Sequence, residues 1–443
     1  SSAASDVYKR QLFQGRRRET YERNEHFPFD PEGIRAVLLS HAHIDHSGNL
    51  PTLARQGFVG NIYATSATRD LAAAMLLDSA HIQEQDAAYL NRKHIRRGEP
   101  PVRPLYSIAE AASCLRYFVG LEYERAFSPV PGVQAIFCDA GHILGSALTV
   151  LDVQEEGRRL RLCYTGDLGR RDQPILRDPA IVHDIDVLIL ESTYGNRLHE
   201  APEDASEQLR QIVIETWRRG GKLIVPAFAV GRTQILVYVL HQLMLHHDIP
   251  ELPVFVDSPL AINVTEVFRL HPECYDAETA GFLANNGDPF GFGRLHYVRS
   301  VEESKSLNFM REPAIIISAS GMAEAGRILH HLKNNVSDPR NTVLLVGYQA
   351  EHTLGRKLQD RLPQVPILGE MVPLRARVEV VTGYSAHADQ NDILAWVQAV
   401  RGRRLKKVFV VHGEEAESNA LAVALRALGG LDVHVPELSL IHI

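Results

Sequence analysis

Four potential metal ligands stand within six residues, directly after a short apolar run. The run Ala36 to Leu39 predicts a buried strand. His41 and His43 stand two apart in extended backbone and therefore point the same way, whereas the next two ligands follow as the chain turns. Imidazole and carboxylate groups are the nitrogen and oxygen ligands that zinc accepts. The spacing suggests one metal ion for each pair of ligands, and the second pair is Asp45 and His46.

Further ligand-type side chains follow other apolar runs, each at the carboxyl end of a predicted strand. A glycine-flanked histidine follows the strand predicted at 133–137, and a Gly-Asp turn follows the one predicted at 160–164. This repeated placement argues for one shared site, and it disfavours the alternative of a polar turn with incidental histidines. The residues are His142, Asp167, Glu191, Ser385, His387 and His412.

Length and composition limit the class of protein. A chain of 443 residues is expected to form two or three domains, and 45% hydrophobic with 23% charged residues is typical of a soluble globular protein. The longest apolar runs fall short of the ~18 residues that a membrane span needs. The four cysteines form no C-x-x-C pair, which is typical of thiols in a reducing cytoplasm. The net charge of −7 means that any nucleic-acid contact must come from a local basic patch.

The motif His-Ala-His-Ile-Asp-His resembles the H-x-H-x-D-H signature of the metallo-β-lactamase fold. The later motifs resemble those of the β-CASP nucleases, and among them the bacterial and archaeal relatives of the cleavage and polyadenylation endonuclease. Glu191 matches motif A, Ser385-Ala-His387 matches motif B, and His412-Gly-Glu matches motif C. The resemblance implies an α/β fold, namely an αββα metallo-β-lactamase sandwich with an inserted parallel α/β β-CASP domain.

The resemblance also implies a centre of two Zn²⁺ ions bridged by the carboxylate of Asp167. A water between the ions would supply hydroxide at neutral pH. Ser385 and His387 are expected at the scissile phosphate, where His387, supported by Glu191, protonates the leaving oxygen. Asp45 is counted both as a ligand and among the catalytic residues. The first ion would be held by His41, His43, His142 and Asp167, and the second by Asp45, His46, Asp167 and His412.

Strands alternate with helices between about Pro202 and Val372, which predicts βαβ units and a parallel sheet. We therefore expect the metallo-β-lactamase domain to comprise 1–200 and 373–437, and the β-CASP domain to comprise 201–372. Three turns of this insert carry glycine close to arginine near a helix start, where backbone N–H groups and a guanidinium can contact phosphate. The arginines are Arg232, Arg327 and Arg356.

The two ends of the chain resemble translated adaptor sequence, and we expect residues 1–11 and 438–443 to be foreign to the protein. Relatives carry an aspartate just before the stretch that matches Leu12-Phe13-Gln14-Gly15. In this sequence Lys9 falls at that place, so the first motif of the family is missing. A divergent N-terminus is the alternative.

The resemblance implies a zinc-dependent ribonuclease that hydrolyses single-stranded RNA as an endonuclease, a 5′-exonuclease or both. It implies a cytoplasmic enzyme without membrane contact, and it allows a homodimer. Three alternatives remain. A small-molecule metallo-hydrolase of this fold, such as a thioesterase, would lack the insert and motifs B and C. A β-CASP DNA-repair nuclease would usually lack histidine at motif C, and a non-catalytic scaffold subunit would usually have lost zinc ligands, which this chain keeps.

Overall fold

The computed structural model describes residues 24–97, 100–155, 157–200, 202–347 and 349–436. The predicted foreign ends and Lys9 lie outside these residues. The chain forms two compact units. The first comprises 1–171, 178–198 and 387–443, and the second comprises 172–177 and 199–386.

A seven-stranded mixed sheet forms the centre of the first unit, with the strand order β18-β17-β8-β7-β6-β5-β4. Neighbours from β4 to β7 are antiparallel, because short turns join them, whereas β7, β8, β17 and β18 run parallel. The strands are β4 (Phe127–Val130), β5 (Val133–Asp139), β6 (Ala147–Glu155), β7 (Arg158–Tyr164), β8 (Val187–Glu191), β17 (Lys407–Val411) and β18 (Asp432–His434).

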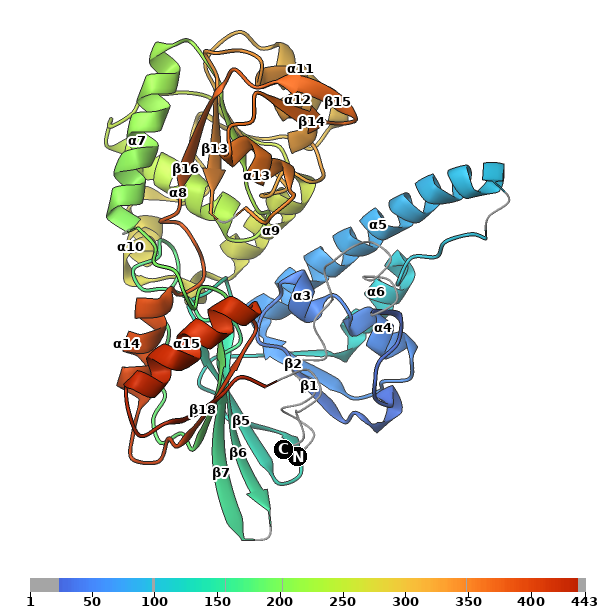
Figure 1. Cartoon of the computed structure of the whole chain (residues 1–443), viewed down its shortest axis with the longest axis vertical. Coiled ribbons are helices and arrows are strands. Elements are labelled where there is room, and N and C mark those ends of the chain that lie inside the picture. The colour runs from blue at the N-terminus through green and yellow to red at the C-terminus, as the bar shows by residue number, and fades with distance from the viewer. Residues whose placement is uncertain (1–23, 98–99, 156, 201, 348, 437–443) are drawn as a thin grey trace. The chain divides into compact units, whose positions relative to one another are not determined.

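Two helices, α14 (Gln390–Val400) and α15 (Glu415–Ala427), cover one face of this sheet (Figure 1). Side chains alternate between the two faces of a strand, so Leu148 and Val150 of β6 both point to the helices. Trp396 of α14 and Leu421 of α15 complete this buried core. The helices therefore form the outer layer on this side.

The opposite face meets a second, three-stranded parallel sheet of β1 (Ala36–Leu38), β2 (Asn61–Thr65) and β3 (Phe118–Leu121). The ring of Tyr63 on β2 lies 5.1 Å from that of Phe127 on β4, which lies 5.2 Å from Phe137 on β5. Helices α4 (Leu50–Arg55), α5 (Ser66–Arg97) and α6 (Ile108–Cys114) lie on this side of the unit (Figure 1). The predicted αββα sandwich is thus confirmed.

The second unit contains a six-stranded sheet in which all neighbours are parallel, in the order β11-β10-β12-β9-β13-β16. This confirms the predicted parallel insert. Its strands are nearly continuous apolar runs, as expected when helices cover both faces. The strands are β9 (Leu223–Pro226), β10 (Val254–Val256), β11 (Leu295–Tyr297), β12 (Ile315–Ser318), β13 (Thr342–Val346) and β16 (Arg377–Val381).

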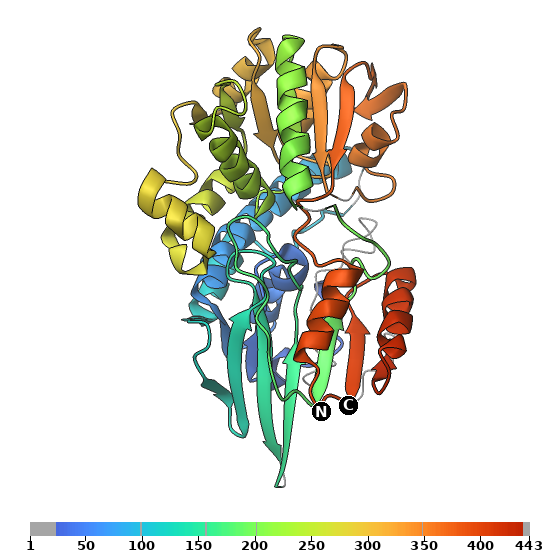
Figure 2. The same ribbon diagram turned by 90° about the vertical axis from the view of Figure 1, so that its left-hand side faces the viewer.

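Helices cover this sheet, and Figure 2 shows α7 lying over its strands. On one face, α12 and α13 pack Leu332 and Leu358 against Ile316 and Leu345. The helices are α7 (Pro202–Arg218), α8 (Arg232–Leu245), α9 (Pro259–Leu270), α10 (Ala277–Asn286), α11 (Val301–Phe309), α12 (Ile328–Asn335) and α13 (Leu354–Gln359). A hairpin of β14 (Gln364–Ile367) and β15 (Glu370–Pro373) follows them.

The predicted domain boundary between 372 and 373 needs a correction. Strand β16 pairs in parallel with β13, so it belongs to the sheet of the second unit, and the chain re-enters the first unit at His387. The prediction assigned this strand to the first unit because a ligand motif follows it. The local sequence of an apolar strand and the motif after it does not show which sheet the strand joins, because pairing partners are not encoded locally.

Two observations bear on the expectations from composition. The four cysteines are free thiols, three of them buried. Among the described residues, no helix combines the length and apolarity that crossing a membrane requires.

A buried ion pair fixes the loops after β10 and β12 in the second unit. The fully buried carboxylate of Asp257 accepts hydrogen bonds of 2.6 Å from Arg327 Nη1, 2.6 Å from His331 Nε2 and 2.5 Å from Ser304 Oγ. Arg327 also donates to the carbonyl oxygens of Val298 and Arg299. These contacts engage the guanidinium within the unit while its side chain stays 20% exposed, and a phosphate contact by Arg327 stays a prediction.

Replacing Asp257 by alanine should destabilise the protein by about 3–5 kcal/mol, because it leaves the Arg327 charge buried without its partner. The midpoint of urea unfolding, measured at pH 7 with the wild type alongside, tests this. Glu207→Ala is the matched control, because its partner Arg210 is a neighbour on the exposed face of α7. Equal midpoints for the two variants would show that the buried pair does not hold these loops.

Candidate metal centre

Four loops of the first unit carry the predicted ligands, and each of them follows a strand. His41 follows β1, His142 follows β5, Asp167 follows β7 and His412 follows β17. His43 caps the amino end of α3 (Ile44–Ser47), a single turn of helix that carries Asp45 and His46. Strands β5, β7, β8 and β17 run in the same direction in the seven-stranded sheet, so their carboxyl ends lie at one edge of it. His41, from the other sheet, lies 3.3 Å from Asp167 at that edge.

The first group of ligands gathers around one oxygen of Asp167. Its Oδ2 lies 3.3 Å from His41 Nε2 and 3.5 Å from His142 Nε2, and His142 Nε2 lies 3.2 Å from His43 Nδ1. Ligand atoms of these four residues all lie within 4.8 Å of one another. Side chains that share one ion are expected at such separations, because Zn–N and Zn–O bonds measure about 2.0–2.2 Å.

The second group gathers around the other oxygen of Asp167. Its Oδ1 lies 3.3 Å from His46 Nε2 and 3.5 Å from His412 Nδ1. The Nε2 atoms of those two histidines lie 3.1 Å apart, and Asp45 Oδ2 lies 3.6 and 3.5 Å from them, respectively. Each oxygen of Asp167 thus faces one group, which is the arrangement that a bridging carboxylate requires.

Backbone conformation brings these loops close together. Gly145 has φ +78°, and a Cβ there would lie 2.5 Å from the backbone nitrogen of Thr68 at the start of α5. His412 also adopts a left-handed backbone, with φ +56°, which is uncommon for a residue that is not glycine. Such conformations persist only where the surroundings enforce them, and they concentrate at functional sites.

The charges of the site favour a bound cation. Burial lowers the pKa of His41, His43 and His142, in the case of His43 to about 3, so these imidazoles are neutral and able to bind metal. Burial opposes ionisation of Asp45 and Asp167, but the surrounding imidazoles outweigh it and hold the pKa of each carboxyl below its usual value. Among the described residues, the ion-pair partners of the buried Asp167 and of Asp45, which is 37% exposed, are histidines rather than lysines or arginines.

The raised pKa of His412 also shows that the carboxylates of this site favour a positive charge beside them. Burial opposes its charged form, yet the Asp167 and Asp45 carboxylates outweigh that effect and raise the pKa to about 10. His41 Nε2 and Asp167 Oδ1 are buried and form no hydrogen bond within the described part of the chain. Their contacts are ion pairs of 3.3–3.5 Å with neighbouring ligand residues, and a metal ion would satisfy both buried polar atoms. The donor set of five imidazoles and two carboxylates fits zinc.

A histidine–glutamate pair lies beside the first group. His387 Nδ1 lies 3.2 Å from Glu191 Oε1, and the His387 and His142 rings are 4.4 Å apart. The fully buried Glu191 accepts backbone hydrogen bonds from Leu168 at 2.6 Å and Thr193 at 3.1 Å. Burial opposes a charge on His387, but Glu191 outweighs it and raises the pKa of the imidazole. The role of this pair in proton transfer stays a prediction.

Two hydroxyl groups that the sequence analysis did not single out contact ligand histidines. Ser40 Oγ lies 3.1 Å from His41 Nδ1, and Thr193 Oγ1 lies 3.1 Å from His412 Nδ1. Partners of this kind fix the tautomer and the orientation of a ligand imidazole. A signal was available for both, because Ser40 directly precedes the first ligand and Thr193 stands two residues after Glu191.

The remaining predicted site residues lie in the second unit. Ser385 is buried, and its N–H donates to the Thr382 carbonyl. Arg232 is buried at the first position of α8, beside Gly347. Arg356 pairs with Asp360 one helical turn later on α13 and stays 40% exposed. Phosphate contacts by these three residues stay predictions.

A four-layer αββα sandwich with six histidines and three acidic groups at one edge of its sheets defines a metallo-hydrolase of the metallo-β-lactamase superfamily. Comparisons with known families agree. The model of the metallo-beta-lactamase superfamily matches residues 20–227, and that of the Beta-Casp domain matches 233–358. A model described as "Zn-dependent metallo-hydrolase RNA specificity domain" matches 371–436.

The chain belongs to the β-CASP family of nucleases, and it is a hydrolytic enzyme. A ribonuclease of Thermus thermophilus is 37% identical over 423 residues, which cover 95% of this chain and 90% of that protein. The transcription termination factors FttA of Methanosarcina mazei and Methanocaldococcus jannaschii are each 32% identical and align with 88% and 92% of this chain. The chain spans only 60% and 63% of those two proteins.

Proposed function

We propose that this protein is a zinc-dependent ribonuclease that hydrolyses phosphodiester bonds of single-stranded RNA. The observation that carries the proposal is the carboxylate of Asp167, whose two oxygens each face a separate group of ligands. A cytoplasmic location and a homodimer stay predictions. The two groups would hold two Zn²⁺ ions, the first with His41, His43, His142 and Asp167, and the second with Asp45, His46, Asp167 and His412.

The hydrolysis consumes one water molecule, breaks one P–O bond, and yields a phosphate monoester and a hydroxyl group. When bound, the two zinc ions would make water nucleophilic at neutral pH and offset the negative charge that develops on the phosphate. The side chains of the protein would hold the two ions in place and supply the proton for the leaving oxygen. His387 would give its proton to the leaving oxygen, and the buried Glu191 carboxylate would keep the imidazole oriented and charged for that step.

The choice of RNA rests on three observations. The Thermus relative is named a ribonuclease, and the model that matches residues 371–436 is described by RNA specificity. Histidine at motif C, His412, is typical of the RNA-processing members of the family, whereas its DNA-repair members usually lack it. Contacts to phosphate cannot distinguish the two nucleic acids, so the 2′-hydroxyl must supply the discrimination.

The experiment is a time course of cleavage with end-labelled RNA and DNA strands of the same sequence. We expect metal-dependent cleavage of RNA, slower cleavage of DNA, and binding to RNA that weakens as salt rises. A chelator should stop cleavage, and added Zn²⁺ should restore it. Equal rates on RNA and DNA would contradict the RNA assignment, whereas full activity in chelator would contradict the metal centre.

A further inference from the structure

A polar pocket lies at the amino edge of the parallel sheet in the second unit. Three loops form it, each directly preceding one of the adjacent strands β9, β12 and β13, and it encloses about 450 Å³. The turns with Arg232, Arg327 and Arg356 follow strands at the opposite, carboxyl edge. The pocket is therefore a place separate from the predicted phosphate-binding turns. Its lining includes Lys222, Asn308, Phe309, Arg311, Asp338 and Arg340.

A buried lysine is the most unusual group in this lining. Lys222 is only 7% exposed, and its Nζ donates to the carbonyl oxygens of Leu307 at 2.9 Å and Asn308 at 3.2 Å, at the end of α11. An ammonium has three protons, so one donor remains after these two hydrogen bonds. Burial lowers the pKa of Lys222, which means that the charge is poorly solvated and would gain from an anion beside it.

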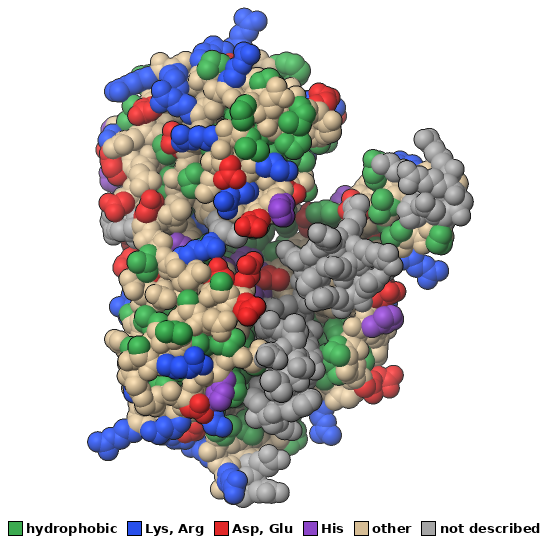
Figure 3. Space-filling view, viewed as in Figure 1, with side chains coloured by type: hydrophobic (Ala, Val, Ile, Leu, Met, Phe, Trp, Pro, Cys, Tyr) green, Lys and Arg blue, Asp and Glu red, His purple; other side chains and the backbone are tan. Residues whose placement is uncertain are grey.

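The charge of the pocket is positive although the chain as a whole is acidic. Lys222, Arg311 and Arg340 contribute three cations, and Asp338, paired with Arg340 at 2.6 Å, contributes one carboxylate. Arg311 is exposed and forms no hydrogen bond or ion pair with the described residues. Figure 3 shows Lys and Arg side chains gathered at the upper end of the second unit in that view. An anion is thus the natural ligand.

Aromatic and amide groups beside these cations make the pocket more than an anion site. Phe309 is 81% exposed at its rim, so its ring is accessible to a ligand in the pocket. Asn308 uses its Oδ1 toward His331 Nδ1 and Asn335 Nδ2, which leaves its own Nδ2 as a donor. An exposed ring offers a stacking surface for a base, and amide groups can bond base edges.

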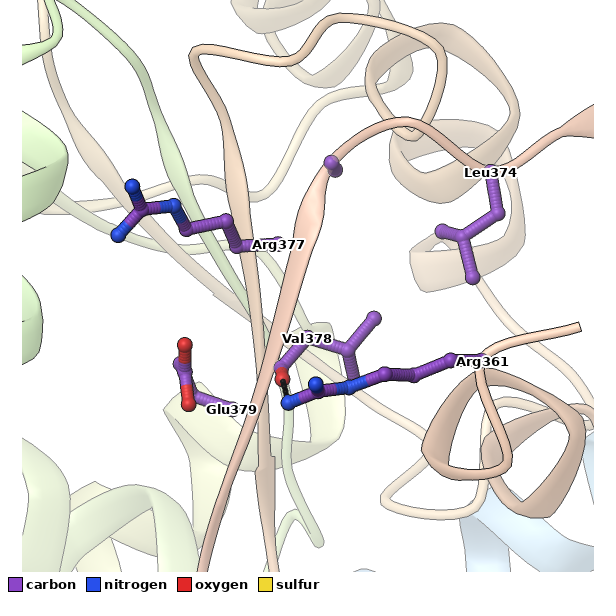
Figure 4. Close-up of a pocket in the computed structure, with 6 residues that line it drawn as sticks. Arg361, Leu374, Arg377, Val378 and Glu379 are labelled. Atoms are coloured by element: carbon purple, nitrogen blue, oxygen red, sulfur yellow. Dashed lines mark hydrogen bonds between the residues drawn. The ribbon is translucent and has the colours of Figure 1, made fainter. Parts of the chain in front are cut away.

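A second hollow, along the edge strand β16, lacks this combination. Arg361 donates to the Val378 carbonyl (Figure 4), and Arg377 pairs with Glu215 at 2.9 Å. Both guanidinium groups are therefore engaged within the unit, and the described lining contains no aromatic ring.

We propose that the pocket formed by Lys222, Arg311 and Phe309 binds a nucleotide, with the phosphate on the two cations and the base on the aromatic ring. The nucleotide can be a free mononucleotide or one residue of an RNA strand, since both offer the same groups. The proposal goes beyond the nuclease reaction, and it is tested by binding, so it can fail while the proposed activity stands.

The test measures binding of 5′-AMP, adenosine, inorganic phosphate and a short single-stranded RNA by calorimetry. Arg311→Gln should weaken binding of 5′-AMP, of the RNA or of both by about tenfold, because a charge-assisted hydrogen bond to phosphate is lost. Phe309→Ala should weaken the same ligands. Both residues are exposed, so neither variant should disturb folding, and Arg294→Gln, an exposed arginine of the same unit, is the matched control.

The arms of the experiment separate the two sources of nucleotide. Loss of 5′-AMP binding identifies a free nucleotide as the ligand, and loss confined to the RNA identifies a strand. Inorganic phosphate that binds as tightly as 5′-AMP would overturn the role of Phe309. Wild-type affinities of Arg311→Gln for all four ligands would overturn the site.

Discussion

Asp167→Ala should remove both metal ions from the protein and lower the rate of RNA cleavage by about 10³-fold or more. The carboxylate is the one side chain that faces both groups of ligands, through Oδ1 on one side and Oδ2 on the other. Its loss therefore weakens both ion sites at once, and with them several kcal/mol of transition-state stabilisation. Elemental analysis should find about two Zn²⁺ per wild-type chain and much less than one in the variant.

Two further variants test whether the loss of both ions is specific to Asp167. Asp152→Ala removes a carboxylate on β6 that pairs with Arg159 and Arg161, and it should keep both the metal and the activity. His41→Ala removes a ligand of the first group alone, so it should lower the metal content less than Asp167→Ala does. A wild-type protein that is fully active with one ion per chain would overturn the assignment of two metals.

The ligands could be predicted because each motif is contiguous with the strand that positions it. His41 stands three positions after the end of β1, and Asp167 stands three positions after the end of β7. The convergence of loops from His41 to His412 depends on strand pairing, which local sequence does not encode. The repeated placement of the motifs at strand ends and the family resemblance both predict it. The structure brings all seven predicted ligands into two groups.

Features that depend on distant contacts were not predictable in this way. The partner of Arg327 is Asp257, which stands 70 positions earlier at the end of a strand, so the ion pair could not be predicted from the local sequence. The assignment of β16 failed for the same reason, since its partner β13 lies across a hairpin and a helix. The pocket at Lys222 combines three loops that share no motif.

His387→Ala should leave the zinc content near that of the wild type and slow RNA cleavage by about 10²–10⁴-fold. The reason is that His387 contacts Glu191 rather than belonging to either group around Asp167, so its loss removes a proton donor and spares the ligands. His183→Ala, an exposed histidine of the same unit, is the matched control and should change neither quantity.

A substrate with sulfur in place of the leaving oxygen separates proton donation from every other role of His387. A thiolate leaves without a proton, so the His387→Ala variant should cleave this substrate nearly as fast as the wild-type protein does, while the matching oxygen substrate stays slow. Because Asp167, Glu191 and His387 also lie within 4.8 Å of one another, His387 could instead bind metal. In that case the variant would lose zinc, and both substrates would be slowed by the same factor. Either of these outcomes would contradict the role of His387 as the acid and would place it among the ligands.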